Sequence, residues 1–124
     1  MSKGCAVYKT ADLIGKRWTL LILLGLYKGE TKWKRYTRLK DELPEITPKI
    51  LSARLKELGR EGLVVRKVDA KSFPIKCEYS LTRGGEEFVR IIRDMKKWAL
   101  RWKVRNEFCE KLDCKNCGLS PRLR

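Results

Sequence analysis

The sequence lacks histidine altogether, and this absence limits the chemistry that the protein can perform. Histidine is the side chain that most often exchanges protons, or binds a metal as a neutral ligand, near neutral pH. Its absence excludes nucleophilic catalysis of both the Ser-His-Asp and the Cys-His type. No paired acidic motif in a pocket-like context takes its place. We therefore expect a protein that is not an enzyme.

A long hydrophobic run is also missing. The longest apolar segment is centred on residues 20–24 and stops at Tyr27, whereas a membrane-spanning helix needs about 20 apolar residues. A secretory leader is disfavoured because Asp12 would lie within it and no small-residue cleavage site follows Tyr27. These patterns predict a cytoplasmic protein with no membrane partner and a buried helix at this segment.

Acidic residues are few. The 15 Asp and Glu face 30 Lys and Arg, which gives a formal net charge of +15 over 124 residues. Such a field concentrates polyanions near the protein surface. Nucleic acid is therefore the first candidate partner, and an anionic membrane is the second. The length suits one domain, and a hydrophobic content of 43% is enough for a single core.

Helical periodicity dominates the hydrophobic pattern. Apolar residues recur every three or four positions over 7–14 and 36–43, residues 18–27 are apolar almost all round, and a brief strand is expected over 31–33. After Thr82, a potential helix cap, the same spacing continues to about Asn106. Because a small domain has little surface to cover so long a stripe, a second copy of the chain is its natural partner.

The segment 47–62 gives the clearest local prediction. Thr47 can cap a helix through its hydroxyl, and Pro48 fits the first helical position, where its missing N–H costs nothing. Gly62 supplies the left-handed residue that commonly ends a helix. Between these ends, isoleucine and leucine side chains form an apolar stripe along one face.

Two strands are predicted directly after this helix. Residues 63–68 are rich in valine, residues 69–76 resemble an exposed loop, and apolar residues alternate again over 77–81. The order short helix, turn, capped helix, strand, loop, strand is that of a helix-turn-helix with a β-wing. We therefore predict a mainly α fold with a small β-hairpin wing (α+β), which is a winged helix-turn-helix.

The face of the capped helix opposite its apolar stripe suits the major groove of DNA. Small Ser52 and Ala53 permit close approach, while Lys49 and Lys56 can reach phosphates or guanine edges. The free N–H groups of the first turn add a favourable site for a phosphate. The DNA contacts predicted on this helix are Thr47, Pro48, Lys49, Ser52, Ala53 and Lys56.

Further basic residues lie on both sides of this helix in the sequence. One group, over 32–40, precedes the helix, and another, over 66–76, belongs to the predicted wing. Any single member is most simply a solvated surface charge. The coincidence of the whole cluster with the motif favours contact with DNA. The members assigned to the interface are Lys34, Arg35, Lys71 and Lys76.

Four segments of the chain resemble the HxlR-type regulators, a branch of the MarR-like winged-helix proteins. Residues 12–23 (DLIGKRWTLLIL) resemble the signature helix of that family. Residues 47–58 (TPKILSARLKEL), 61–64 (EGLV) and 78–82 (EYSLT) follow in the same order and spacing. The resemblance holds from about Cys5 to Trp102, so it covers most of the chain.

This resemblance implies a homodimer, joined through the first and last helices, that binds a palindromic operator in double-stranded DNA. It also implies that Arg54 lies on or near the DNA-reading surface, with a phosphate or a structural carboxylate as its partner. In some members an N-terminal cysteine, followed by proline, senses oxidants or electrophiles. Cys5 occupies this place, although Ala6 replaces the proline.

Beyond a winged-helix and dimerisation domain over 1–106, the tail over 107–124 adds three cysteines, Cys109, Cys114 and Cys117. With Cys5 they would supply four thiolates, as a structural zinc site or an iron–sulfur cluster requires. Alternatively, two of them form a disulfide, or Cys5 pairs with the partner's tail as in some relatives. A third alternative is inert thiols. We assign no cofactor, and these alternatives stay open.

The main hypothesis is therefore a dimeric transcriptional regulator, with repression as the expected sign of regulation. Cysteine chemistry is a possible means of control, either through thiol oxidation or through a bound metal. A winged-helix adaptor that binds proteins instead of DNA is the alternative, and the basic recognition face argues against it. Cys77, which lies within a strand pattern, is expected to be a small core residue.

Overall fold

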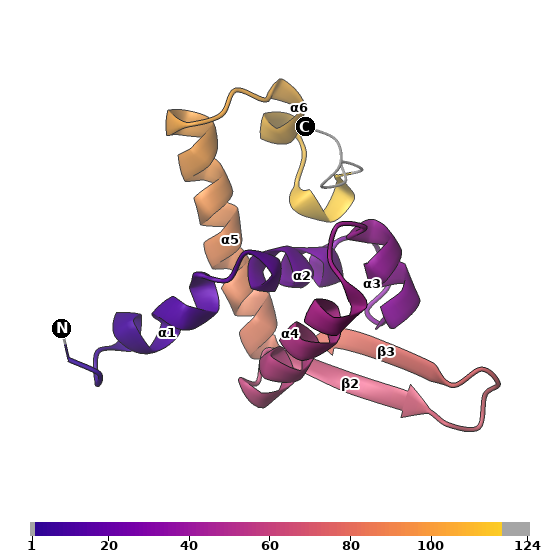
Figure 1. Ribbon diagram of the computed structural model, residues 1–124. Helices are drawn as coiled ribbons and strands as arrows, with labels where there is room; N and C mark the ends of the chain where they lie inside the picture. The colour runs from indigo at the N-terminus through magenta and orange to yellow at the C-terminus, as the bar shows by residue number, and fades with distance from the viewer. Residues whose placement is uncertain (1, 118–124) are drawn as a thin grey trace.

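The computed structural model describes residues 2–117, and no helix among them is long and apolar enough to cross a membrane. The mainly helical architecture with one small sheet confirms the predicted fold class (Figure 1). In chain order the elements are α1 (Ala6–Ile14), α2 (Arg17–Tyr27), β1 (Lys34–Arg35), α3 (Tyr36–Glu42), α4 (Pro48–Arg60), β2 (Val64–Asp69), β3 (Lys76–Leu81), α5 (Arg83–Trp102), α6 (Glu107–Lys111) and the short 3-10 helix η1 (Cys114–Asn116).

Helix α2 lies at the centre of the molecule, in contact with α3, α4, α5 and the sheet. Its sequence is apolar almost all round, as suits a helix that is covered on several sides. Ile22 and Leu23 are completely buried. From them the core continues through leucines of α3 and α4 to Val89 and Ile92 of α5.

Helix α4 begins and ends as the sequence predicts. The Thr47 hydroxyl accepts a hydrogen bond from the Ile50 N–H at 3.2 Å, and Pro48 takes the first helical position. Gly62, with φ of +80°, turns the chain out of the helix and into β2. The apolar stripe faces the core through Leu51, Leu55 and Leu58.

The sheet has three antiparallel strands in the order β1-β3-β2. Strands β2 and β3 pair along their whole length and extend away from the helices as a hairpin (Figure 1). Near its tip, the Asp69 carboxylate accepts hydrogen bonds from the Lys71 N–H at 3.1 Å and the Ser72 hydroxyl at 2.8 Å. These bonds fix the first half of the loop. The hairpin is the predicted wing.

The first strand differs from its prediction. The sequence pattern predicts a strand over 31–33, but β1 lies at Lys34–Arg35. Its position is set by pairing with Tyr79 of β3, far along the chain. The residues around 31–35 carry no information about this distant pairing partner, so their pattern does not locate the strand.

The end of α5 differs as well. The apolar spacing predicts a helix to about Asn106, but α5 ends at Trp102. There the N–H groups of Lys103 and Val104 both bond to the carbonyl of Ala99, each at 2.7 Å. The start of the helix is as predicted, since the Thr82 hydroxyl caps it.

The described part of the tail folds back onto α2 and α5. The Asp113 carboxylate accepts hydrogen bonds from the Arg93 guanidinium at 3.0 Å and from the Tyr27 hydroxyl at 3.4 Å. The Lys96 ammonium donates to the Leu112 carbonyl at 2.6 Å. The chain beyond α5 is therefore held against the body of the protein by polar contacts with two helices.

Candidate nucleic-acid interface

One face of α4 is exposed and carries no large apolar side chain. Small residues occupy the middle of this face and a lysine lies toward each end, so the helix backbone stays accessible. This is the composition that close approach to a DNA groove requires. Contact with DNA stays a prediction for the exposed residues Thr47, Pro48, Lys49, Ser52, Ala53 and Lys56.

Tyr36 connects α3 to this face. Its hydroxyl donates a hydrogen bond to the Pro48 carbonyl at 3.2 Å and lies 3.3 Å from the Ser52 hydroxyl oxygen. The two helices of the helix-turn-helix are thus linked at the exposed surface as well as in the core. The helical spacing over 36–43 predicts that Tyr36 lies on an apolar face, and it gives no signal for this polar contact.

Arg54 lies at the edge of the same surface and has a carboxylate partner. Its guanidinium is 3.0 Å from a Glu57 oxygen, and the Lys16 ammonium is 3.0 Å from the other oxygen. The hydrogen bond from Lys16, with Arg54 beside it, lowers the pKa of the Glu57 carboxyl. The sequence predicts either a phosphate or a structural carboxylate as the partner of Arg54. The structure contains the carboxylate, Glu57, whose contact with Lys16 joins α4 to the segment before α2.

Lys34, which the sequence pattern assigns to the DNA interface, lies in the interior instead. Its side chain is 1% exposed, and its ammonium bonds to the Gly25 carbonyl at 2.5 Å and to Glu42 at 2.9 Å. Burial lowers the pKa of Lys34, while the bond to Glu42 opposes that shift. A lysine enclosed in this way cannot contact DNA, so its assignment to the interface is wrong. Its neighbour Arg35 is exposed, because successive side chains of a strand point to opposite faces.

The wing presents a second basic surface. Arg66, Lys67, Lys71 and Lys76 are exposed along β2, the loop and β3. The Lys67 ammonium lies 4.5 Å from the centre of the Trp33 ring, so its position is fixed by an aromatic face.

A groove of about 530 Å³ runs between α4 and the wing. Lys56 and Arg60 of α4 line one side, and Arg66 of β2 lines the other. Neither Arg60 nor Arg66 is among the assigned site residues, although Arg66 belongs to the basic segment 66–76 and Arg60 to the polar face of the capped helix. The two basic surfaces therefore face a common channel.

Cys77 contacts two residues that line this groove, Arg66 and Tyr79. The Arg66 Nε–H donates to the Cys77 sulfur at 3.2 Å, and the thiol donates to the Tyr79 hydroxyl at 3.4 Å. Burial, with the neighbouring Cys77, raises the pKa of Tyr79 to about 12, so this phenol is neutral at physiological pH. The thiol is half-buried and packs against the hydrophobic core, so the predicted core residue lies at the edge of the core.

The four cysteines considered for redox or structural roles are dispersed. Cys5 precedes α1, whereas Cys109, Cys114 and Cys117 lie in the tail, on another side of the molecule (Figure 1). All four are half-buried. Burial raises the pKa of the Cys114 thiol. Within residues 2–117, no group of three or more acidic or cysteine side chains is placed to hold a metal ion.

Comparison with known proteins gives concordant matches. Residues 13–107 match the sequence model of a family described as HxlR-like helix-turn-helix. YvaP of Bacillus subtilis, an uncharacterised HTH-type transcriptional regulator, is 38% identical over 94 residues, which are 76% of this chain and 83% of YvaP.

Solved structures agree with the sequence matches. The reduced form of the transcriptional regulator YodB from B. subtilis superposes with a TM-score of 0.69 at 33% identity, covering 83% of this chain and 98% of YodB. The redox regulator HypR in its oxidised form gives a TM-score of 0.68 at 33% identity, covering 81% of this chain and 99% of HypR. The family match at residues 13–107 contains α2, α3, α4, the wing and α5.

Proposed function

Because the chain belongs to the HxlR-like helix-turn-helix family and is a transcriptional regulator of that type, we propose that it represses transcription as a homodimer on a palindromic operator. Helix α4 enters the major groove, and the wing contacts the adjacent backbone. The observation that carries this proposal is the exposed, small and basic face of α4 beside the basic wing. The net charge of +15 supplies the long-range attraction.

The DNA contacts are proposed in two classes. On α4, Lys49, Ser52 and Ala53 meet base edges, whereas Lys56 and the first-turn N–H groups bind phosphate. Outside α4, phosphates are contacted by Arg35, Lys71 and Lys76. Arg54 supports the surface through Glu57 and is not a principal contact.

Selection of operator sequences from genomic fragments, followed by gel shift, tests this proposal. We expect a discrete bound fragment with inverted half-sites. Replacing Lys49 and Ser52 together by alanine should weaken discrimination between the operator and a scrambled duplex more than it weakens nonspecific binding. Equal losses would contradict base readout by α4, and the absence of any bound fragment would favour a protein-binding adaptor.

Dimerisation is supported by apolar surface that the described chain leaves uncovered. Helix α1 has no buried residue, and both α1 and the far half of α5 project from the core (Figure 1). Val7 is 69% exposed on α1, and Trp98 and Trp102 are 56% and 64% exposed on α5. Exposed apolar stripes of this size mark association surfaces. We propose that two copies join through these first and last helices.

Sedimentation equilibrium tests the dimer. Trp98→Glu places a charge on the proposed interface, so the monomer fraction at micromolar concentration should rise at least about tenfold. Phe73→Glu, at the fully exposed wing tip, introduces the same charge away from it and should leave the dimer intact. Equal monomer fractions in the two variants would exclude α5 from the interface.

Thiol-based control is proposed for Cys5 and the tail cysteines. The supporting observations are the half-buried thiols of Cys5, Cys109 and Cys114, together with relatives solved as a diamide-treated YodB, a quinone-bound YodB and an oxidised HypR. We expect diamide to lower DNA affinity in the parent protein but not after replacement of Cys5 by serine. An unchanged affinity in the oxidised parent would contradict sensing, and metal analysis of freshly purified protein tests the cysteine-ligated alternative.

The division into a domain over 1–106 and a tail over 107–124 remains part of the proposal. Residues 118–124 lie outside the described residues. The matched family segment ends at residue 107, which agrees with a tail that is an addition to the family fold.

A further inference from the structure

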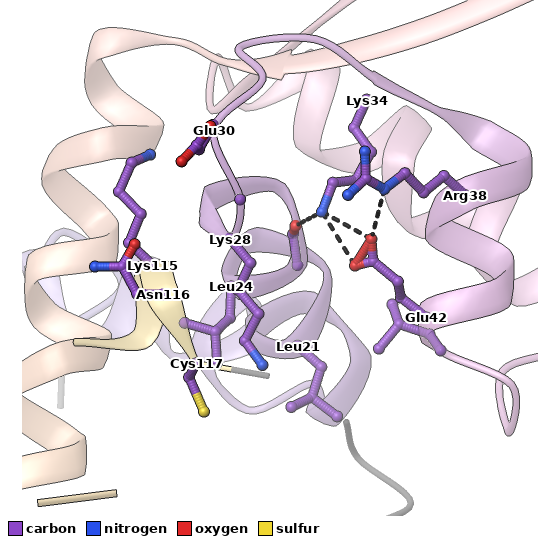
Figure 2. A pocket seen from close by; sticks show the side chains of 13 residues that line it. Leu21, Leu24, Lys28, Glu30, Lys34, Arg38, Glu42, Lys115, Asn116 and Cys117 are labelled. Atoms are coloured by element: carbon purple, nitrogen blue, oxygen red, sulfur yellow. Dashed lines mark hydrogen bonds and ion pairs between the residues drawn. The ribbon is translucent and has the colours of Figure 1, made fainter. Parts of the chain in front are cut away.

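A pocket of about 530 Å³ lies on the side of α2 that is remote from the wing, between α2, α3 and the tail. Figure 2 shows its two kinds of wall. Leu21 and Leu24 of α2, with Cys117 of the tail, form an apolar part, and the Lys34–Glu42–Arg38 group forms a charged part. This volume lies within the range of about 300–1,000 Å³ that small-molecule sites occupy.

The charged part carries an excess of positive charge. The Glu42 carboxylate is 2.9 Å from the Lys34 ammonium and 3.2 Å from the Arg38 guanidinium, so one carboxylate is shared by two cations. Among the residues of the lining that the structure describes, four cations face two carboxylates. Lys34 is buried, which keeps it in place and raises the electrostatic gain from any further anion nearby.

We propose that this pocket binds a small organic anion that has a single carboxylate and an apolar body. The carboxylate lies against the exposed Arg38 guanidinium, and the enclosed Lys34 ammonium attracts it from behind Glu42 without direct contact. The apolar body covers Leu21 and Leu24, which are only partly buried in the described chain. A cationic ligand of the same shape is disfavoured, and a neutral one loses the electrostatic contribution.

The pocket is connected to the DNA-reading surface through α3. Arg38 and Glu42 belong to the same seven-residue helix as Tyr36, whose hydroxyl bonds to the Pro48 carbonyl at the start of α4. A ligand that shifts α3 therefore acts on the position of α4. The ligand then changes the affinity of the protein for operator DNA by some factor. By thermodynamic linkage, bound DNA must change the affinity of the protein for the ligand by the same factor.

Titration of the full-length protein, without DNA, tests the binding site by itself. The probes are hexanoate and phenylacetate, with 1-hexanol, hexylammonium and acetate as comparisons. Using ¹⁵N-labelled protein, we expect hexanoate or phenylacetate at millimolar concentration to shift the amide signals of Gly25, Gly29 and Leu24. Hexanol should bind at least about threefold more weakly, the usual size of a partly exposed charge interaction. Hexylammonium and acetate should leave these signals unchanged.

Matched variants locate the site. Arg38→Gln and, separately, Lys28→Gln should each lower carboxylate affinity about threefold without changing the affinity for hexanol. Lys111→Gln removes the same charge from an exposed position on α6 and should have no effect. Thermal unfolding of each variant establishes that it is folded before titration.

Three results would overturn the inference. They are no amide shift with either carboxylate, equal binding of hexylammonium, or equal affinities in Arg38→Gln and Lys111→Gln. Because the titration contains no DNA, its failure leaves the proposed operator binding untouched. Conversely, a carboxylate that binds while no operator is found would contradict only the regulator proposal.

Discussion

Lys34 joins three elements, two of them through its ammonium group and the third through its backbone. It bonds to the Gly25 carbonyl at the end of α2 and to Glu42 at the end of α3, while its backbone pairs with β3. A cation near the C-terminus of a helix is favoured by the helix dipole. Its role is therefore structural, in contrast to that of the exposed cations around it.

The adjacent positions Lys34 and Arg35 provide a matched pair. Lys34→Met should lower the free energy of unfolding by about 1–3 kcal/mol, because it leaves a buried carbonyl without its donor. DNA affinity should change little below the melting temperature. Arg35→Gln should do the opposite, weakening DNA binding with little loss of stability. Urea unfolding and fluorescence anisotropy measure the two effects, and a Lys34→Met protein that is fully stable but weak in DNA binding would contradict this assignment.

Asp113 predicts a pH dependence for the docking of the tail. The hydrogen bond from the Lys115 N–H, at 3.0 Å, lowers the pKa of the Asp113 carboxyl, and Arg93 acts in the same direction. Since the pKa is lower in the folded state, the stabilisation is complete above the unfolded value of about 3.9. It is lost as pH falls through the folded value.

Asp113→Asn should therefore be less stable than the parent protein at pH 7, and this difference should shrink as pH approaches 3. Asp94→Asn, at an exposed position on α5, is the control and should show no such convergence. Urea unfolding across this pH range gives the differences directly. A constant difference at all pH values would show that the carboxylate charge does not hold the tail.

At the scale of single residues, the sequence is informative where the interaction partner is nearby in the chain. The Thr47 cap is predictable because its partner lies three residues away. Burial of Lys34 is not, since Gly25 and Glu42 lie on other elements. In the sequence, the basic residues of the cluster around Lys34 cannot be distinguished from one another. In the folded chain, strand alternation turns Lys34 inward and Arg35 outward.

Helix α4 owes its boundaries to local chemistry, and this can be measured. Thr47→Ala removes the hydrogen bond to the Ile50 N–H and should lower the free energy of unfolding by about 1 kcal/mol. Thr10→Ala is a matched change on α1, where the hydroxyl bonds back to the Ala6 carbonyl and caps no free N–H. Its effect on urea unfolding should be within about 0.5 kcal/mol. Equal effects in both variants would show that the cap does not stabilise α4.

The elements differ in how far the sequence predicts them. The order of helices and the wing follows from periodicity, caps and the closing glycine, and the structure confirms it. The two-residue strand β1 depends on pairing with β3, and the end of α5 depends on a turn at Lys103 and Val104. Hydrophobic periodicity predicts neither feature. Docking of the tail was not predicted, because its anchors are charged residues on distant helices.

At the scale of the whole molecule, two features remain unbalanced in a single chain. Apolar side chains of α1 and α5 are exposed, and 30 basic residues face only 15 acidic ones. A second copy of the chain would cover the first feature, and DNA would neutralise the second. The sequence alone indicates both features, but only the fold shows that the exposed apolar side chains and the basic face of α4 lie on different surfaces.

Salt dependence of operator binding tests the central claim, that α4 holds DNA, most directly. We expect the logarithm of the binding constant to fall linearly with the logarithm of salt concentration, with a slope of about −0.9 per neutralised phosphate. Replacing Lys49 and Lys56 by glutamine should reduce the magnitude of the slope by about 1–2. The same change at Lys97 and Lys111, away from α4, should leave it unaltered. A flat salt dependence, or equal slopes in the two double variants, would contradict the account.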